Sequence, residues 1–267
     1  MIDSHCHLAG EEFAADLDDV VARAKRVGVT GALCILAAGD DAEAKRAEAV
    51  RQAWPAVRFA AGIHPHQAGD FARNPEAGID IVRRAVQAHH ACAIGEIGLD
   101  YHYDFSPRDV QQAIFRAQVD LARELGLPVI IHTREATEDT FRILREAGAG
   151  RVGGVFHCFT GDETMARAAF DLDFYLSFAG IVTFPRADAI RSAARITPAD
   201  RLLAETDAPY LAPVPYRGRR NEPAYVAEVV AKLAEIRGTP PAEVAGQVTG
   251  NFNQLFVGRG SHSNLTA

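Results

Sequence analysis

The stretch Pro128-Val129-Ile130-Ile131-His132 is a short, apolar, β-branched run that ends in a polar side chain. A segment of helical periodicity at 109–125 precedes it, and a second one at 137–147 follows it. The run has the length and composition of a β-strand, whereas its two neighbours have one apolar and one polar face. This part of the chain therefore predicts a strand between two helices.

The same unit recurs along the chain. The predicted strands lie at 1–5, 31–36, 57–62, 92–97, 128–132, 152–157, 174–178 and 201–205. The predicted helices lie at 17–27, 42–54, 79–89, 109–125, 137–147, 163–170, 187–195 and 223–236. We expect an extra C-terminal helix at 247–256 after the last unit.

Strict alternation of strand and helix is typical of parallel strands joined by right-handed crossovers. Eight such units within one domain's length predict an α/β fold, a closed (β/α)8 TIM barrel. An open, doubly wound sheet is the main alternative, but no glycine-rich phosphate loop follows the first strand and no Pro/Ser/Gly-rich linker divides the chain. We expect one domain over residues 1–257 and a flexible tail over 258–267.

The composition is that of a soluble globular protein. The 267 residues are 48% apolar and 24% charged, and the formal net charge of −7 excludes a strongly basic coat for nucleic acid. The first residues do not resemble a secretory signal, and no apolar run approaches the ~20 residues of a membrane span. The four cysteines lack the spacing of a disulfide framework. We expect a cytoplasmic protein, and nothing in the sequence indicates membrane association or an obligate protein partner.

The first predicted strand leads into Asp3-Ser4-His5-Cys6-His7. Because alternate side chains of a strand share a face, His5 and His7 point to the same side. Two imidazoles on one face are the start of a metal site. The alternative is a pair of histidines that hydrogen-bond to backbone groups, so the rest of the chain has to decide.

Four more residues with potential ligand side chains end apolar runs in their own strand-helix units. They are Glu96, His132, His157 and Asp207. The carboxyl ends of barrel strands meet at one mouth, so the predicted fold brings these four together with His5 and His7. Any one of them alone would more simply be a hydrogen-bonded structural residue. All six together predict a metal site, because coordination removes the cost of burying their polar groups.

Four neutral imidazoles and two carboxylates suit Zn²⁺, Mn²⁺, Fe²⁺, Co²⁺ or Ni²⁺ better than Ca²⁺, which prefers an oxygen cage. Mg²⁺ fits this ligand set less well and stays a candidate. Six protein ligands exceed what one tetrahedral ion with an open position uses, so we expect two divalent metal ions per chain. Glu96 is the candidate bridge between them.

Seven motifs in this order resemble the TatD family of metal-dependent hydrolases. They are Asp3-Ser4-His5-Cys6-His7, Gly62-Ile63-His64-Pro65, Gly95-Glu96-Ile97-Gly98-Leu99-Asp100-Tyr101, His132-Thr133-Arg134, His157-Cys158-Phe159-Thr160-Gly161, Glu205-Thr206-Asp207-Ala208-Pro209-Tyr210 and Arg219-Arg220-Asn221-Glu222-Pro223. The resemblance implies an amidohydrolase-like barrel and a phosphodiesterase, typically a deoxyribonuclease of exonucleolytic type. It also implies that His5, His7 and Asp207 hold one ion, that His132 and His157 hold the other, and that Glu96 bridges them.

We expect a second set of residues to hold the substrate phosphate. His64 ends the third predicted strand and Arg134 follows His132, so both would face the mouth. Arg219 and Asn221 lie in the loop after the last strand, near which barrels often bind phosphate. The alternative for this arginine-rich loop is a solvated basic segment without a substrate role.

As the reaction, we expect hydrolysis of a DNA phosphodiester bond by a metal-activated hydroxide. Glu96 and Asp207 are the catalytic candidates, with Asp207 placed to orient the attacking water and accept its proton. The nucleic-acid or phosphoester substrate would bind locally at the barrel mouth. The same site would suit a D-aminoacyl-tRNA deacylase or another carboxylic-ester or lactone hydrolase. The non-enzymatic alternative is an inactive barrel that acts as a binding protein. Asp100, Tyr101, His102 and Asp104 either orient the ligands or form a lip for the substrate.

Overall fold

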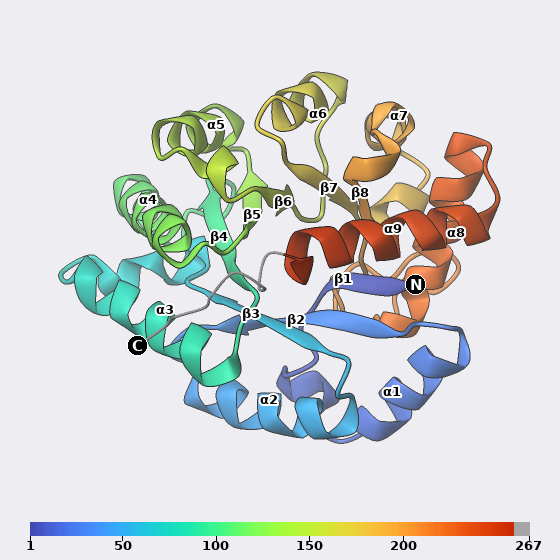
Figure 1. Ribbon diagram of the computed structural model, residues 1–267, viewed down its shortest axis with the longest axis horizontal. Helices are drawn as coiled ribbons and strands as arrows, with labels where there is room; N and C mark the ends of the chain where they lie inside the picture. The colour runs from blue at the N-terminus through green and yellow to red at the C-terminus, as the bar shows by residue number, and fades with distance from the viewer. Residues whose placement is uncertain (259–267) are drawn as a thin grey trace.

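The computed structural model describes residues 1–258 and contains one sheet of eight parallel strands in the order β1-β2-β3-β4-β5-β6-β7-β8 (Figure 1). The strands are β1 Ile2–Cys6, β2 Gly31–Ala37, β3 Arg58–Gly62, β4 Ala93–Asp100, β5 Val129–Arg134, β6 Gly154–Phe156, β7 Tyr175–Phe178 and β8 Leu202–Ala204. Each predicted strand overlaps one of these. The prediction of a (β/α)8 barrel is confirmed.

An α-helix follows each strand. These helices are α1 Leu17–Arg26, α2 Asp41–Ala53, α3 Pro75–His89, α4 Arg108–Leu125, α5 Thr137–Glu146, α6 Glu163–Phe170, α7 Asp188–Ile196 and α8 Val226–Arg237. Short 3-10 helices lie at η1 Glu11–Phe13, η2 Pro65–Phe71, η3 Ala149–Arg151, η4 Gly180–Thr183, η5 Ala199–Arg201 and η6 Pro223–Tyr225. The expected extra helix is α9, Pro241–Phe256, which begins earlier than residue 247 because Pro241 suits a first helical turn. Except for Gly258, the expected tail lies outside the described residues.

The barrel closes between its last strand and its first. The backbone amide of Asp207 donates to the carbonyl of His5 at 3.0 Å, and the amide of His7 donates to the carbonyl of Ala208 at 2.8 Å. Three of the six predicted ligands therefore lie on this seam. The hydrogen bonds that close the barrel therefore also fix the distance between His5 and His7 on one side of the seam and Asp207 on the other.

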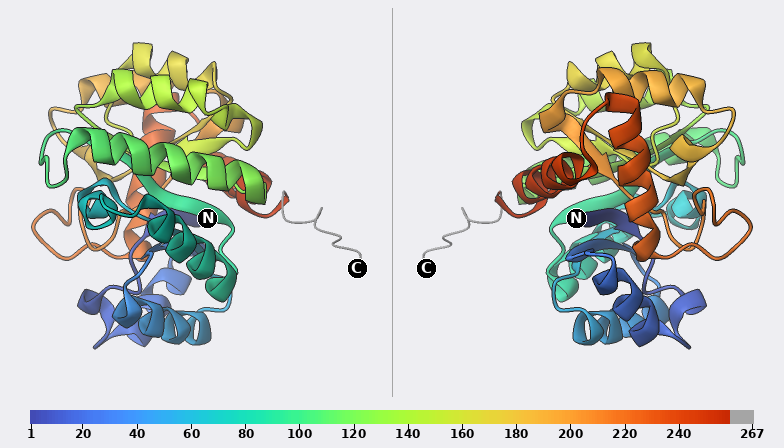
Figure 2. Two further views of the ribbon diagram at one scale, coloured as in Figure 1. Left: turned by 90° about the vertical axis from the view of Figure 1, so that its left-hand side faces the viewer. Right: turned by 90° about the vertical axis from the view of Figure 1, so that its right-hand side faces the viewer.

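The amino end of the barrel is covered by α9. Its aromatic and aliphatic side chains pack against residues that fill the barrel interior: Phe252, Leu255 and Phe256 against Leu33, Ile35, Ile130, Val155 and Leu203. The amide of Asn251 donates to the carbonyl of Leu202, where β8 begins. Side views show α9 at one end of the barrel and the long loop between β8 and α8 at the other (Figure 2). Because α9 packs on the residues that fill the barrel interior at the amino end, the polar side chains that end the strands gather at the carboxyl end.

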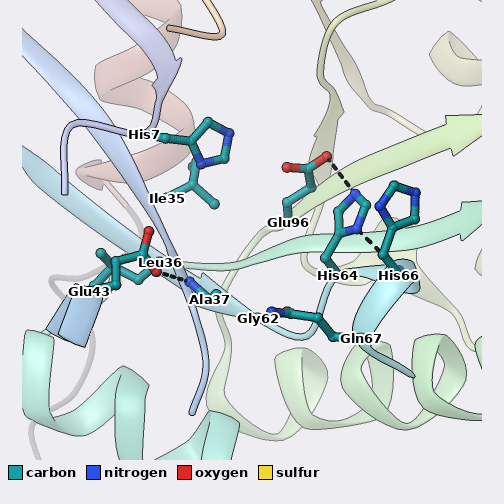
Figure 3. A pocket seen from close by; sticks show the side chains of 10 residues that line it. All are labelled: His7, Ile35, Leu36, Ala37, Glu43, Gly62, His64, His66, Gln67 and Glu96. Atoms are coloured by element: carbon teal, nitrogen blue, oxygen red, sulfur yellow. Dashed lines mark hydrogen bonds and ion pairs between the residues drawn. The ribbon is translucent and has the colours of Figure 1, made fainter. Parts of the chain in front are cut away.

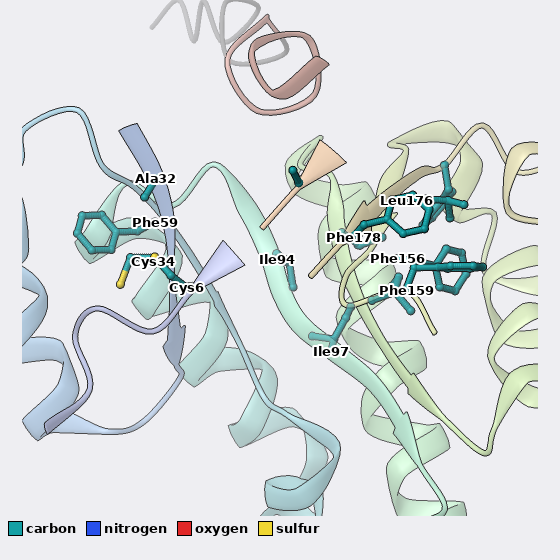
Figure 4. Close-up of a cluster of buried hydrophobic side chains, with 14 of the residues drawn as sticks. Cys6, Ala32, Cys34, Phe59, Ile94, Ile97, Phe156, Phe159, Leu176 and Phe178 are labelled. Carbon is teal, nitrogen blue, oxygen red and sulfur yellow. The ribbon is translucent and has the colours of Figure 1, made fainter. Parts of the chain in front are cut away.

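A second layer of apolar side chains lies between the strands and the surrounding helices. It includes Cys6, Cys34 and Phe59 from the early strands and Phe156 and Phe178 from the later ones, all with 0 or 1% of their surface exposed (Figure 4). This packing holds the strands in place, so the strand ends form a rigid platform for polar side chains. None of the helices in residues 1–258 is long and apolar enough to cross a membrane.

Candidate metal centre

The six predicted ligands meet at the carboxyl end of the barrel. Around Glu96, the Nε2 atom of His5 lies 3.5 Å from Oε2, and Nδ1 of His132 lies 2.9 Å from Oε1. Nε2 of His157 lies 2.7 Å from the same Oε1 atom. Asp207 completes the set, with Oδ1 at 3.8 Å from Nε2 of His5 and 3.5 Å from Nε2 of His7. Residues from five strands thus form one continuous cluster.

Glu96 reaches the middle of this cluster because β4 passes very close to β5. Every residue of β4 is buried, and Gly98 in that strand has a φ of +145°. A Cβ atom at Gly98 would collide with the carbonyl oxygen of His132. Glycine is the residue that allows both this backbone conformation and this approach of the two strands.

Burial and mutual attraction shape the charges of the cluster. Burial opposes ionisation of Glu96, but the surrounding imidazoles outweigh it and hold the pKa of this carboxyl well below its usual range. Burial likewise opposes ionisation of Asp207, and the contact with His7 and the other imidazoles lowers its pKa. Desolvation lowers the pKa of His5, which is wholly buried. The cluster therefore contains charged carboxylates and, at His5, an imidazole whose charge burial opposes. At His7, His132 and His157 burial also opposes the charge, but the neighbouring carboxylates outweigh it and raise the pKa.

Some of these buried polar atoms have no hydrogen-bond partner in the described part of the chain. They include both ring nitrogens of His5. Unpaired polar atoms in a protein interior are costly, and nearly all native ones are satisfied. A divalent cation would satisfy imidazole nitrogens in this position. The residues present therefore fit a metal ion.

The distances suggest a slightly different division of ligands from the one that the resemblance implies. One group of mutually close ligand atoms comprises His5, His7 and Glu96, and a second comprises His64, Glu96 and His132. Nε2 of His64 lies 3.5 Å from Oε1 of Glu96, so this residue, expected to bind phosphate, is also placed as a ligand. His157 belongs to neither of these groups and instead lies near His5 and Glu205.

A side pocket of about 230 Å³ adjoins the cluster. His7 and Glu43 lie on one wall, and His64, His66 and Glu96 lie on the other (Figure 3). The main cavity, of about 690 Å³, is lined by His7, Glu96, His132, His157 and Asp207 among others. Both spaces open on the same group of polar side chains, so a substrate in the main cavity reaches the candidate ligands.

Two further carboxylates hold the histidines in place: Asp100, which the sequence offers as an orienting residue or part of a substrate lip, and Glu205, which the sequence does not single out. Glu205 is completely buried, accepts a hydrogen bond from the amide of Cys158 at 2.7 Å, and lies 3.3 Å from Nδ1 of His157. Asp100 lies 3.1 Å from Nε2 of His132 and 2.9 Å from Nε2 of His66. Carboxylates behind ligating histidines orient the rings and raise their basicity.

Asp3 is a third buried carboxylate near the seam. It accepts hydrogen bonds from the amide of Thr206 at 2.9 Å and from its hydroxyl at 2.5 Å. Burial raises the pKa of Asp3 to about 8. Its contacts hold the backbone next to Asp207. For Asp3 and Glu205 the only signal in the sequence is that each lies two positions before a predicted ligand, His5 and Asp207 respectively.

The residues expected to bind phosphate are dispersed. Arg134 is exposed at the cavity wall, and its guanidinium makes no ion pair in residues 1–258. Arg219 is exposed on the β8–α8 loop and is not among the residues that line the cavity. Asn221 is 0% exposed, and its amide donates to the carbonyls of Thr206 and Tyr210 at 2.7 and 2.6 Å. The amide of Asn221 thus braces the loop and does not face the cavity.

The rest of this arginine-rich loop is tied to its surroundings. Arg220 pairs with Asp16 at 2.7 Å, and Arg217 lies over the ring of Phe184 at 4.1 Å. Only Arg134, of the cations considered for phosphate, combines a place on the cavity wall with a free guanidinium in the described residues.

Comparison with known proteins identifies the group to which the chain is similar. The profile of the family described as TatD-related DNases matches residues 2–257. An uncharacterized metal-dependent hydrolase of Bacillus subtilis, YabD, is 42% identical over 96% of this chain and 98% of its own length. A protein of Enterobacter lignolyticus named 3'-5' ssDNA/RNA exonuclease TatD is 38% identical over 96% of this chain and 98% of its own. The crystal structure of YjjV, a TatD homologue of Escherichia coli, superposes with a TM-score of 0.86 at 30% identity and covers 96% of this chain and 97% of the other.

Proposed function

The chain belongs to the TatD-related DNase family of metal-dependent hydrolases, and from that premise we propose that it hydrolyses phosphodiester bonds of DNA at the end of an unpaired strand. The single observation that carries the proposal is the position of Glu96 within contact distance of four imidazoles, at the floor of an open cavity. The name of the Enterobacter relative adds support for a single-stranded substrate.

The six residues that the sequence predicts would hold divalent metal, Glu96 would contribute to more than one ion if two are bound, and His64 would be a further ligand or a phosphate contact. Bound ions would supply Lewis acidity, which lowers the pKa of water and polarises the scissile phosphate. Glu205 and Asp100 would hold the rings of His157 and His132 in the ligating orientation.

Two residues of the chain would act directly on the substrate. Asp207 lines the cavity, and its Oδ atoms would orient the attacking water and accept a proton from it. Arg134 would bind a phosphate oxygen through its free guanidinium, which lowers the cost of the negative charge that the transition state carries.

The test uses the purified chain after chelation and reloading with Mg²⁺, Mn²⁺, Zn²⁺, Ni²⁺ or Co²⁺ in turn. Single-stranded DNA labelled at the 5' or the 3' end is the substrate, with duplex DNA, D-aminoacyl-tRNA and a panel of lactones beside it. We expect metal-dependent shortening of the single strand from one end, which the two labels distinguish. The Asp207→Asn variant serves as the inactive control.

The assignment is wrong if no metal supports cleavage of DNA while a lactone or the aminoacyl-tRNA is hydrolysed. It is equally wrong if Asp207→Asn, loaded with metal to the same content, cleaves DNA at the wild-type rate. RNA in the same assay shows whether the sugar matters.

A further inference from the structure

Large hydrophobic side chains are exposed mainly at one end of the molecule. In the described part of the chain the most exposed are Val27, Tyr103, Phe105, Tyr210 and Val214. Tyr103 and Phe105 lie on the loop after β4, and Tyr210 and Val214 lie on the loop after β8. Single exposed hydrophobic residues are ordinary on protein surfaces, but a group around the mouth of an active-site cavity indicates a binding surface.

Tyr103 and Phe105 form a stacked pair. Their ring centroids are 5.2 Å apart, the rings are inclined by only 12°, and their exposed fractions are 47 and 67%. The guanidinium of Arg134 lies over the Tyr103 ring, with Cζ 4.7 Å from its centroid. Tyr103 therefore stacks both on Phe105 and on the guanidinium of Arg134, the cation on the cavity wall that makes no ion pair in residues 1–258.

The loop that carries the pair is anchored at both ends. The amide of Tyr103 donates to the buried carboxylate of Asp100 at 3.0 Å. At the other end, the hydroxyl of Ser106 donates to the carbonyl of His66 at 2.9 Å, and the side chain of Gln111 donates to the carbonyl of Ser106 at 2.8 Å. Exposed rings on a well-anchored loop lose little conformational entropy when a ligand stacks on them.

We propose that the Tyr103–Phe105 pair is a stacking site for an unpaired nucleobase, next to the phosphate that the metal centre cleaves. The inference rests on the proposed function. Tyr103, Arg134 and the candidate ligands line the same cavity, so a nucleotide with its phosphate at the metal centre has an aromatic surface within the same space. Aromatic rings beside a cation suit a base and its phosphate, whereas a purely apolar ligand would leave Arg134 and the carboxylates unpaired.

The pair also gives the enzyme a physical reason to prefer single strands. A base in a duplex stacks on its neighbours and has no free face for Tyr103 or Phe105. An unpaired end has one, and stacking of a base on an aromatic side chain is worth about 1–3 kcal/mol, or a factor of about 5 to 150. Tyr210 lies in the same cavity but contacts the candidate ligand His7, so we leave it out of the test.

The test compares the double variant Tyr103→Ala/Phe105→Ala with the wild type on two single-stranded oligonucleotides. One is intact, and the other lacks the bases of the two terminal residues at each end. We expect kcat/KM on the intact strand to fall by about 5-fold to 100-fold in the variant, and to be unchanged on the abasic strand. Val27→Ala, which removes an exposed side chain just after α1, is the control and should retain the wild-type rate. Tyr103→Phe, which keeps the ring, should lose much less activity on the intact strand than the double variant.

If the double variant loses the same fraction of kcat/KM on the intact and the abasic strand, the substitution has displaced Arg134 or the loop. If the double variant cleaves the intact strand at the wild-type rate, the rings do not stack on a base. Either result overturns the inference.

A second readout does not depend on catalysis. An oligonucleotide with 2-aminopurine at its ends is titrated with metal-free protein, since stacking quenches the fluorescence of this base. Quenching by the wild type and not by the double variant supports the stacking site, even if the wild type cleaves no DNA and the proposed function fails. Equal quenching by both proteins refutes the stacking site, even if DNA is cleaved.

Discussion

Both ends of the barrel carry a polar cavity, but the polar side chains at the two ends differ in whether they find partners within the protein. At the carboxyl end, both buried ring nitrogens of His5 have no hydrogen-bond partner in residues 1–258. At the amino end, a pocket of about 430 Å³ is lined by Arg51, Arg58 and His89, among others. Arg51 there donates to the carbonyl of His89, lies over the ring of Phe59 and approaches Glu48 at 3.4 Å.

The difference shows that polarity alone does not identify a functional site. Arg51 at the amino end makes its bonds within the protein, whereas His5 at the carboxyl end is fully buried with both ring nitrogens lacking a hydrogen-bond partner in residues 1–258. In the function that we propose, the amino end, closed by α9, contributes to stability and the carboxyl end contributes the chemistry. The following predictions test this division, in order of decreasing effect.

The strongest test replaces the centre of the metal site. Glu96→Gln keeps the shape of the side chain and removes the charge that holds the imidazoles together. We expect kcat to fall by about 1,000-fold or more. Adding divalent metal to the chelated wild type should raise its Tm, and this rise should be absent in the variant. Glu48→Gln at the amino end is the matched control and should keep both properties. A Glu96→Gln protein with normal turnover would contradict the proposed centre.

The second test removes a side chain from the closed end. Phe252 of α9 is 3% exposed and packs against the barrel interior. We expect Phe252→Ala to lower the free energy of unfolding by about 3–5 kcal/mol, since it leaves a cavity in the core. The kcat of the folded variant at low temperature should stay at the wild-type value. A loss of kcat without a loss of stability would show that the two ends are coupled.

A third test concerns the carboxylate behind a ligand. In Glu205→Gln the hydrogen bond from Cys158 can persist, but the negative charge next to His157 is lost. We expect metal affinity to fall by about 10-fold to 100-fold, measured by competition with a chromophoric chelator. Saturating metal should restore most of the activity. Unchanged affinity would mean that Glu205 has only a structural role.

The smallest effect is expected from His89 at the amino end. Partial burial, with the nearby Arg51 charge, lowers the pKa of His89 below its ordinary value of 6.5. The unfolded chain therefore binds this proton more tightly, and the folded state gains stability as the pH rises through the ordinary pKa. His89→Gln removes this dependence. Urea unfolding gives the free energy of unfolding of the variant and of the wild type at each pH. We expect the difference, variant minus wild type, to be more favourable to the variant at about pH 5.5 than at about pH 8. An equal difference in unfolding free energy between variant and wild type at the two pH values would refute this pH dependence.

Most of the fold can be predicted from the sequence because strand and helix have local signatures. The run at 128–132 and its neighbours identify one unit, and the repetition of that unit identifies the barrel. The start of α9 was placed too late because its first turns carry little periodicity before Val248. The strand ends were predicted well enough to nominate Glu96, His132 and His157 as neighbours.

The contacts across the barrel could not be predicted in the same way. Glu205 reaches Cys158, which lies 47 positions away in the chain, and no local pattern records such a contact. Asn221 is predicted as a substrate group in a basic loop, yet its side chain braces that loop from within. Conversely, the sequence does not single out Tyr103 and Phe105, whose exposure is visible only in the structure.

The sequence by itself therefore determined the barrel, the end of the barrel at which polar residues gather, and the residue types that suit a divalent metal. These follow from periodicity, which is a property of neighbouring residues. The tertiary structure decided which atoms meet: Glu96 in the middle of the imidazoles, His64 among them, and Arg134 against Tyr103. Such contacts depend on the pairing, twist and close approach of strands that are distant in the chain, and only the closed barrel contains that information.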